Sequence, residues 1–397
     1  MDNTLLITKL NQNQKEYIAA ALYQDKKMLE VTLEPAEQQS ILGNIYVGRV
    51  KNIVKNINAA FIEIAPGLPC YYPLDEMKQP LFVKKINSPN MVQGDEVVVQ
   101  VVQESSKSKP PKVTTNLNFS GKYLVLTSEN KRLGISRKIE EEKRKELKEH
   151  LNFDTFEDFG LIVRTNAISA SKEEILEEYK KLKQEYRNLQ STAPYRTVFS
   201  CLKESTPEYL HMLQNVSQLW LTSILTDDPK LFEKAQEYLK EAQPEDLKKL
   251  TFYEDSGITL KSLYRLEHHL KEALLEKVWL KSGGYLVIQP TEALTVIDVN
   301  SGKSVSKKQV QEHYLKINLE AAEEIARQLR LRNLSGIIIV DFIDMKSDDS
   351  RELLMQTLGR AASADPVPVK VVDMTKLNLV ELTRKKVRKS LAEQVRL

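Results

Sequence analysis

The sequence predicts a multidomain protein of mixed α+β and α/β class. With 397 residues, 41% of them hydrophobic and 28% charged, the chain is long enough for two to four cores and too apolar to be disordered. Short strand-like runs with turn signals dominate its first third, whereas strand-like runs and helical periodicity alternate in its last third. These patterns predict separate β-rich and α/β parts.

Residues 3–36 favour paired strands at 4–8, 17–22 and 28–33, which are separated by polar turns. A ribbon of this kind needs a partner to cover it.

Residues 41–115 favour a small barrel. The segments IYVGRVKNIV, AAFIEI, YYPL and EVVVQVV predict short antiparallel strands, and Val113 re-enters a strand after the polar loop 105–112. Five such strands with interspersed basic and aromatic residues favour an OB-fold.

The side chains of this barrel suit single-stranded nucleic acid. Arg49, Lys51 and Lys55 supply charge for phosphates, and Phe61 and Tyr71 offer ring faces on which bases stack, each worth about 1–3 kcal/mol. An alternative is that Phe61, inside an apolar run, belongs to the core. The net charge of +3 is too small to argue for nucleic acid by itself.

Residues 118–205 predict strands at GKYLVLTS and DFGLIVRTNA, with a charged helix between them. Ser171 and Glu174 form a capping box before a second, long helix. Arg164 and Thr165 end the second strand, where a guanidinium and a hydroxyl form a natural pocket for a terminal phosphate. The alternative is that Arg164 pairs with a surface acid.

Residues 206–275 predict mostly helices, one of which begins at Asp228 and Pro229. The pair His268 and His269 lacks further ligands at metal-binding spacing, so a surface or core role is favoured over a metal site. Cys70 and Cys201 stand alone, and we expect both to be small buried hydrophobic residues rather than zinc or disulfide partners.

Residues 283–345 predict a strand, a helix and a strand. The runs 294–299 and 337–343 have the composition of strands buried on both faces. Between them one helical face is apolar, and residues 333–336 stop the helix. That face consists of Val310, Tyr314, Ile317, Ala321, Ile325 and Leu329.

Asp298 and Asp341 lie near the ends of those two strands. A crossover makes the strands parallel, so both carboxylates are expected at the carboxyl-terminal edge of one sheet, with Asn300 on the side of Asp298. Close carboxylates either share a proton or bind a hard cation through oxygen, and the absence of nearby His or Cys suits Mg²⁺, or Mn²⁺, better than zinc. A lone Asp at a strand end more commonly caps a turn. By strand alternation Asp344 is expected on the other face from Asp341.

The chain resembles the ribonuclease E/G family through four segments, and the resemblance covers nearly its whole length. They are GGYLVI-x-x-TEALTVIDVNSGK, NLEAAEEIARQLRLRNLSGIIIVDFIDM, GNIYVGRVKNI and AAFIEI. The resemblance implies an RNase H-like subdomain at 1–38 and 206–277 and an OB-fold RNA-binding domain at 39–117. It further implies a 5′-sensor region at 118–205 and a DNase I-like catalytic subdomain at 278–397.

The resemblance also implies roles for particular residues. Asp298 and Asp341 would hold the catalytic magnesium with the help of Asn300, and Phe61, Tyr71 and Lys109 would contact RNA. The 5′-monophosphate sensor implied by the family consists of Gly121, Val125, Arg164 and Thr165.

The sequence departs from the family pattern at three places. Gln289 stands where relatives have Asp, and Asn378 replaces a Gly. The chain also lacks the cysteines that share zinc between subunits, so we expect no zinc and leave a homodimer without a zinc link open.

We therefore expect a Mg²⁺-dependent endoribonuclease that prefers single strands and leaves 5′-phosphate and 3′-hydroxyl ends in rRNA maturation and mRNA turnover. The alternatives are a non-catalytic RNA-binding factor and a DNA nuclease with the same metal site. No apolar run approaches the roughly eighteen residues of a membrane helix and the N-terminus has no secretory pattern, so we expect a cytoplasmic protein without a membrane partner.

Overall fold

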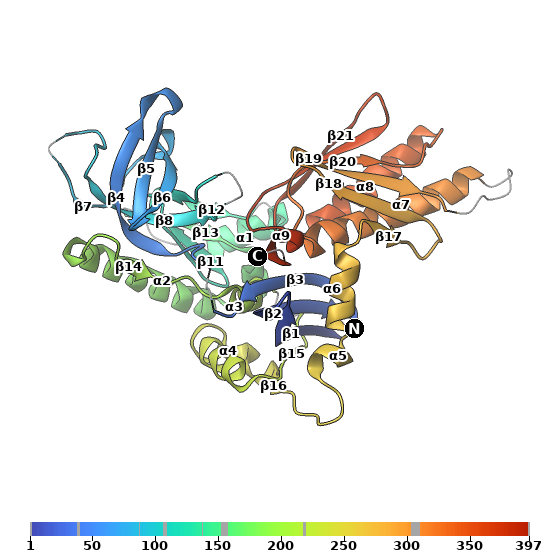
Figure 1. The fold of residues 1–397 in the computed structure, drawn as a ribbon, viewed down its shortest axis with the longest axis horizontal. Coiled ribbons are helices and arrows are strands. Elements are labelled where there is room, and N and C mark those ends of the chain that lie inside the picture. The colour runs from blue at the N-terminus through green and yellow to red at the C-terminus, as the bar shows by residue number, and fades with distance from the viewer. Residues whose placement is uncertain are drawn as a thin grey trace. The chain divides into compact units, whose positions relative to one another are not determined.

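The computed structural model describes residues 2–37, 40–86, 88–105, 109–136, 138–151, 158–216, 220–302 and 310–395, and Figure 1 shows the course of the chain. The chain divides into two compact units. Unit 1 consists of Met1–Gln38, Leu221–Gln236 and Lys248–Leu397, and unit 2 consists of Gln39–Trp220 and Glu237–Leu247. The protein is a mixed α/β molecule with several sheets.

The first sheet of unit 1 has the strand order β16-β15-β1-β2-β3. Its strands are β1 (Asn3–Gln12), β2 (Lys15–Gln24), β3 (Lys27–Pro35), β15 (Ser223–Thr226) and β16 (Leu250–Phe252). The predicted N-terminal ribbon is confirmed, and its partner is β15, which runs parallel to β1.

The region 206–275 is mostly helical, as predicted, and it also contains the short strands β15 and β16. Its helices are α3 (Glu208–Asn215), α4 (Pro229–Ala242), α5 (Leu260–Leu263) and α6 (Leu266–Leu274). The predicted start of α4 is confirmed, since the Asp228 carboxylate accepts the backbone N–H of Leu231 at 3.0 Å.

The second sheet of unit 1 has the order β17-β18-β19-β20-β22-β21. Its strands are β17 (Lys277–Trp279), β18 (Tyr285–Pro290), β19 (Leu294–Asn300), β20 (Gly336–Asp341), β21 (Val369–Met374) and β22 (Leu379–Arg384). The helices α7 (Val310–Leu331) and α8 (Asp348–Ser363) belong to its hydrophobic core, and Figure 1 shows them together beside these strands. The predicted helix between two parallel strands is thus confirmed.

Burial alternates along β19 and β20, so the prediction of strands buried on both faces is wrong. Ile297, Val299 and Val340 point into the core, whereas Asp298 and Ile337 are exposed. The sheet has one face covered by α7 and α8 and a second face, the open face, which bears Asp298 and Ile337. Residues 342 and 343, predicted as strand, follow the end of β20.

Unit 2 contains a small closed barrel. Five strands close through the order β4-β5-β6-β9-β8 and the additional pairing of β4 with β8, while β7 and β14 extend the sheet. The strands are β4 (Ile45–Val54), β5 (Ala59–Ala65), β6 (Leu68–Pro73), β7 (Phe82–Lys84), β8 (Glu96–Gln103), β9 (Lys112–Thr114) and β14 (Cys201–Lys203). Every pairing within the closed barrel is antiparallel except that of β6 with β9.

A four-stranded sheet with two helices follows in unit 2. Its order is β10-β11-β13-β12. The elements are β10 (Asn118–Ser120), β11 (Leu124–Thr127), β12 (Leu133–Ile135), β13 (Gly160–Val163), α1 (Glu141–Leu151) and α2 (Lys172–Thr192). The predicted capping box of Ser171 and Glu174 opens α2 and is confirmed.

The C-terminal basic segment, residues 383–395, packs within unit 1. Arg384 is buried and its guanidinium donates to the Asp365 carboxylate at 2.8 Å. Arg388 pairs with Glu30 at 3.2 Å, and α9 (Leu391–Val395) packs against β3. Residues 396 and 397 lie outside the described residues.

Candidate active site

Two carboxylates lie side by side on the open face of the second sheet. Asp298 near the end of β19 and Asp341 at the end of β20 are register partners in a parallel pairing, so their side chains point to the same face. Both are exposed. The Asn300 amide donates to the Asp298 carboxylate at 2.7 Å, which places Asn300 on that face too. The predicted proximity of these three side chains is what the fold shows.

Two glycines allow a close backbone approach beside Asp298, Asn300 and Asp341. A side chain on Gly284 would lie 2.8 Å from the carbonyl oxygen of Asn300, and one on Gly302 would lie 2.3 Å from the carbonyl oxygen of Gly283. The start of β18 therefore approaches the end of β19 more closely than any other residue type permits.

The negative charges around Asp341 repel one another. Partial burial, together with the neighbouring charges of Asp298 and Asp344, raises the pKa of Asp341. Asp344 follows the end of β20, so strand alternation does not apply to it, and its negative charge contributes to the raised pKa of Asp341. The Asn378 amide donates to Asp344 at 3.2 Å from a left-handed backbone position (φ 62°), which suits the glycine that Asn378 replaces.

The donors of this group fit a hard divalent cation. Asp298 and Asp341 offer exposed carboxylate oxygens that repel each other, a repulsion that a cation removes, and the amide of Asn300 orients one of them. Within the described parts of the chain no three His, Cys, Asp or Glu side chains cluster in a way that could hold a metal ion. A hard cation between Asp298 and Asp341 would complete its coordination with further oxygens.

The predicted RNA-contacting residues lie on the outside of the barrel. Phe61 and Tyr71 are register partners on β5 and β6, half-buried, with ring centroids 6.2 Å apart and an interplanar angle of 71°. Their neighbours Ala60 and Ile62 fill the barrel core, so the alternative placement of Phe61 in the core does not hold. Lys109 is exposed, and the backbone N–H of Tyr71 donates to the nearby Pro111 carbonyl at 2.7 Å.

Two of the three predicted basic residues, Arg49 and Lys51 on β4, pair with acids. Arg49 contacts Glu96 at 3.0 Å, and Lys51 contacts Glu63 at 2.9 Å. A phosphate would compete with these carboxylates for the side chains of Arg49 and Lys51. The attraction of this strand for phosphate is therefore weaker than its sequence suggests.

The predicted sensor residues gather at one edge of the four-stranded sheet. The Arg164 guanidinium donates to the Gly121 carbonyl at 2.6 Å and to the Asn215 side chain, and Val125 pairs with Ile162 two residues before Arg164. Thr165 is exposed directly after β13. Arg164 thus has internal partners, and no surface acid pairs with it among the described residues.

One acid in this region was not foreseen. The Glu178 carboxylate accepts the backbone N–H groups of Lys122, Tyr123 and Leu124 at 2.6, 2.8 and 2.7 Å. A side chain on Gly121 would collide with that carboxylate at 2.3 Å. The only sequence signal was an acid on the predicted α2 close to its apolar stripe, because the partner amides lie more than fifty residues away.

A second unforeseen group is the buried Lys122, whose ammonium lies 2.7 Å from Glu245 and 2.8 Å from Asp246. Its partners also lie far away in the sequence, so local periodicity does not reveal them.

Other candidates from the sequence have ordinary roles. Cys70 is buried, which raises the pKa of its thiol to about 12, whereas Cys201 is exposed and the expectation that it is buried was wrong. Burial lowers the pKa of His269, and His268 lies 3.2 Å from Glu272.

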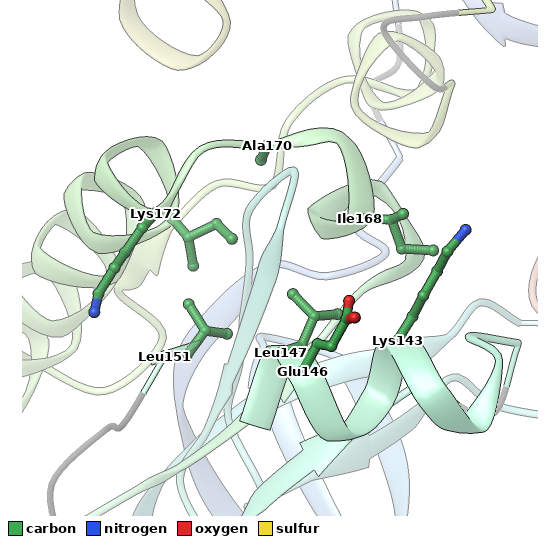
Figure 2. Close-up of a pocket in the computed structure, with 8 residues that line it drawn as sticks. Lys143, Glu146, Leu147, Leu151, Ile168, Ala170 and Lys172 are labelled. Carbon is green, nitrogen blue, oxygen red and sulfur yellow. The ribbon is translucent and has the colours of Figure 1, made fainter. Parts of the chain in front are cut away.

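A cavity of about 230 Å³ between α1 and the start of α2 contains none of the predicted site residues. Figure 2 shows the ammonium groups of Lys143 and Lys172 at its opposite ends. It is lined by Lys143, Glu146, Leu147, Leu151, Ile168, Ala170, Lys172 and Ile175.

The barrel and the acid pair together indicate an enzyme that cleaves nucleic acid. The model of the Ribonuclease E/G family matches residues 118–387, which is more than half of the chain. The chain therefore belongs to the ribonuclease E/G family of endoribonucleases.

Individual relatives match nearly the whole chain. The chain is 33% identical to Ribonuclease E of Haemophilus influenzae over 97% of this chain and 42% of the relative. It is 34% identical to Ribonuclease G of the same organism over 98% of this chain and 81% of the relative, and 32% identical to Ribonuclease G of Escherichia coli K12 over 91% and 76%. The chain thus spans less than half of that Ribonuclease E and about four fifths of the Haemophilus Ribonuclease G.

None of the helices in the described ranges has both the length and the apolar character of a bilayer span.

Proposed function

We propose that this protein is a Mg²⁺-dependent endoribonuclease that cuts single-stranded RNA during RNA processing and decay. The observation that carries the proposal is the register pairing of Asp298 with Asp341 on an exposed face, with Asn300 bonded to Asp298. A protein that only binds RNA gains nothing from two adjacent carboxylates close to a polyanion, because they repel it.

The proposed mechanism assigns separate tasks to the chain's own residues. Asp298 and Asp341 hold the cation, and Asn300 fixes the orientation of the Asp298 carboxylate through its amide. A bound Mg²⁺ supplies Lewis-acid chemistry at a phosphodiester. Phe61 and Tyr71 stack on unpaired bases, which explains a preference for single strands, and Lys109 contributes charge. Hydrolysis leaves a 5′-phosphate and a 3′-hydroxyl.

The proposed domain assignment follows the same lines. The closed barrel with one parallel pairing supports an OB-fold at 39–117. The sheet β16-β15-β1-β2-β3 supports an RNase H-like subdomain formed from two segments, and the sheet with α7 and α8 supports a DNase I-like catalytic subdomain at 278–397.

The decisive test compares matched RNA and DNA single strands in magnesium with wild-type protein and Asp298→Asn. We expect RNA to be cut, DNA to resist, and Asp298→Asn to lose at least about a hundredfold in rate, because it removes a charged cation ligand. RNA binding by the variant is expected to stay within a few fold of wild type.

Three results would contradict this assignment. Near-normal cleavage by Asp298→Asn would place the chemistry elsewhere, equal cleavage of DNA would indicate a nuclease without sugar selectivity, and binding without any cleavage by the wild type would indicate a non-catalytic RNA-binding factor. Asp373→Asn is the matched control, because Asp373 is exposed on β21 of the same sheet and is not assigned to the site.

We also propose that substrates with a 5′-monophosphate are preferred through Gly121, Val125, Arg164 and Thr165. The cluster at the end of β13 supports this, since Arg164 contacts Gly121 and Thr165 is exposed beside it. A pocket for one phosphate loses charge-assisted bonds with a 5′-hydroxyl and clashes with a triphosphate.

The sensor test compares RNAs that differ only at the 5′ end. We expect the monophosphate to be cut several-fold faster than the hydroxyl or triphosphate, and Arg164→Ala to remove the difference. Because Arg164 also holds Gly121 and Asn215, Thr165→Ala serves as a milder variant that leaves these bonds intact. Equal rates on all three ends in the wild type would remove the sensor from the mechanism.

A further inference from the structure

Two aromatic side chains and a lysine form a patch on the open face of the second sheet. We call Trp279, Tyr285 and Lys277 the aromatic platform. Trp279 on β17 and Tyr285 on β18 are register partners whose ring centroids lie 5.3 Å apart with an interplanar angle of 60°. The Lys277 ammonium lies 4.1 Å from the Trp279 ring centroid and 3.7 Å from that of Tyr285. Trp279 is 65% exposed, although large aromatic side chains are usually well buried.

The platform lies on the same face as the acid pair. Tyr285 pairs with both Trp279 and Asn300, and Val287 pairs with both Lys277 and Asp298, so two rows of residues cross the sheet from the platform to the site. Register partners point to the same face. With about 4.8 Å between neighbouring strands, Trp279 lies roughly 10 Å from Asn300 along its row.

The exposed rings and the cation of the platform are suited to binding a nucleotide. Exposed ring faces stack on any base, and the cation beside them attracts a phosphate. Among the described residues no carboxylate pairs with Lys277. In this part of the chain the Lys277 ammonium contacts the two rings, and its charge is available for an anion.

We propose that the aromatic platform binds one unpaired nucleotide of the RNA next to the cleavage site, with its base on Trp279 and its phosphate near Lys277. The inference rests on the proposed function of the acid pair. It makes Trp279, Tyr285 and Lys277 positioning residues that determine which stretch of RNA reaches Asp298 and Asp341.

Kinetics test the proposal. Removing one stacked base costs between about five- and a hundredfold in binding, so we expect Trp279→Ala to raise KM by that factor and to change kcat less than twofold. Trp279→Phe keeps a ring face and should recover most of the loss. Lys277→Gln should weaken binding and reduce its dependence on salt concentration.

Fluorescence gives a readout that does not need activity. The chain has two tryptophans, so a Trp220→Phe background leaves Trp279 as the only one. In EDTA, a single-stranded RNA of about ten nucleotides should quench its emission on binding. The same RNA with abasic nucleotides throughout should quench far less, because it offers phosphates without bases.

Tyr195→Ala is the matched control, since Tyr195 is 88% exposed and lies in unit 2. It should change neither KM nor the fluorescence response, and unchanged melting temperatures would show that the Trp279 variants fold. If the wild type does not cut RNA, the proposed function fails whatever the fluorescence shows.

If the wild type cuts RNA but Trp279→Ala keeps its KM within twofold and RNA does not quench Trp279, the platform proposal fails and the proposed function stands. A fall in self-association on Trp279→Ala with unchanged RNA affinity would likewise overturn the proposal in favour of a second copy of the chain.

Discussion

The conflict between Asp298 and Asp341 is the most informative feature at the scale of single residues. Burial and two neighbouring negative charges raise the pKa of Asp341, so the metal-free fold holds its proton more tightly than the unfolded chain does. Stability is then lost as the pH rises from the ordinary range of a carboxyl group through the raised pKa. Cations relieve the same conflict, so function and metal-free stability oppose each other at this position.

We therefore expect Asp341→Asn to stabilise the metal-free protein while it abolishes cleavage. In EDTA at neutral pH the variant should melt at a slightly higher temperature than the wild type, and the difference should shrink as the pH falls below the carboxyl range. Magnesium should reverse the order, because it stabilises only the protein that binds it.

Thermal melting with and without magnesium, at pH values from about 4 to 8, checks this. A metal-free variant that melts below the wild type at every pH would contradict the like-charge explanation. Asp373→Asn, on the exposed edge of the same sheet, should show neither effect.

At the scale of elements, α2 anchors the turn before β11 through one carboxylate. Glu178 accepts three consecutive backbone N–H groups, while burial raises its pKa against the opposing effect of these bonds. In Glu178→Gln an amide NH₂ group replaces one accepting oxygen and faces a backbone donor. We expect the free energy of unfolding to fall by about 1–3 kcal/mol.

Urea denaturation measures this change, and Glu177→Gln is the control because Glu177 is exposed on the same helix. The two variants should differ clearly in midpoint, and equal stabilities would show that the bonds to residues 122–124 contribute little. Glu178 and Arg164 attract each other electrostatically. A loss of 5′-end preference in Glu178→Gln would therefore indicate that this carboxylate supports the proposed sensor through Arg164.

The elements also show what the sequence can and cannot predict. The stripe from Val310 to Leu329, the capping box at Ser171 and the start of α4 depend on residues three or four apart, and all three predictions were right. The strands β15 and β16 were not predicted, because they are short and extend a sheet begun by β1, more than two hundred residues earlier.

The same limit applies to the candidate site. Asp298 and Asp341 were predictable, because a strand, a helix and a strand bring two acids to one sheet edge by a general rule. That one face of this sheet is open was not predictable, because it depends on which elements pack against the sheet. Glu178 was not predictable either, because its backbone partners lie more than fifty residues away and only the folded chain brings them near.

At the scale of the whole molecule, Glu30 links three distant parts of unit 1. Its carboxylate contacts Arg330 of α7 at 2.7 Å and Arg388 of the C-terminal segment at 3.2 Å. Burial acts in the opposite direction, but the two arginines hold the pKa of Glu30 below its usual range. This stabilisation is present above the ordinary pKa of a glutamate and is lost as the pH falls through the lowered pKa.

Glu30→Gln should therefore destabilise the protein by about 3 kcal/mol at neutral pH, because it removes the carboxylate that the partly buried guanidinium groups of Arg330 and Arg388 contact. The difference from wild type should disappear in acid, below the lowered pKa. Chemical denaturation at several pH values measures it, with the exposed Glu37→Gln as control. A difference that stays constant with pH would show that packing, not charge, explains the loss.

The parallel pairing of β1 with β15 also has a consequence for how the chain is made. Thr4 pairs with Ser223, and Ile224 in turn pairs with Leu250, so the ribbon β1–β3 lacks the last strand of its sheet until about 215 further residues after Pro35 have been synthesised. At 5–20 residues per second this takes roughly 11 to 43 s. During that interval a ribosome holds a nascent ribbon whose β1 edge has no neighbour, and open edges of this kind invite pairing with other chains. Translation rate and chaperones that shield the first forty residues thus become factors in the yield of folded enzyme.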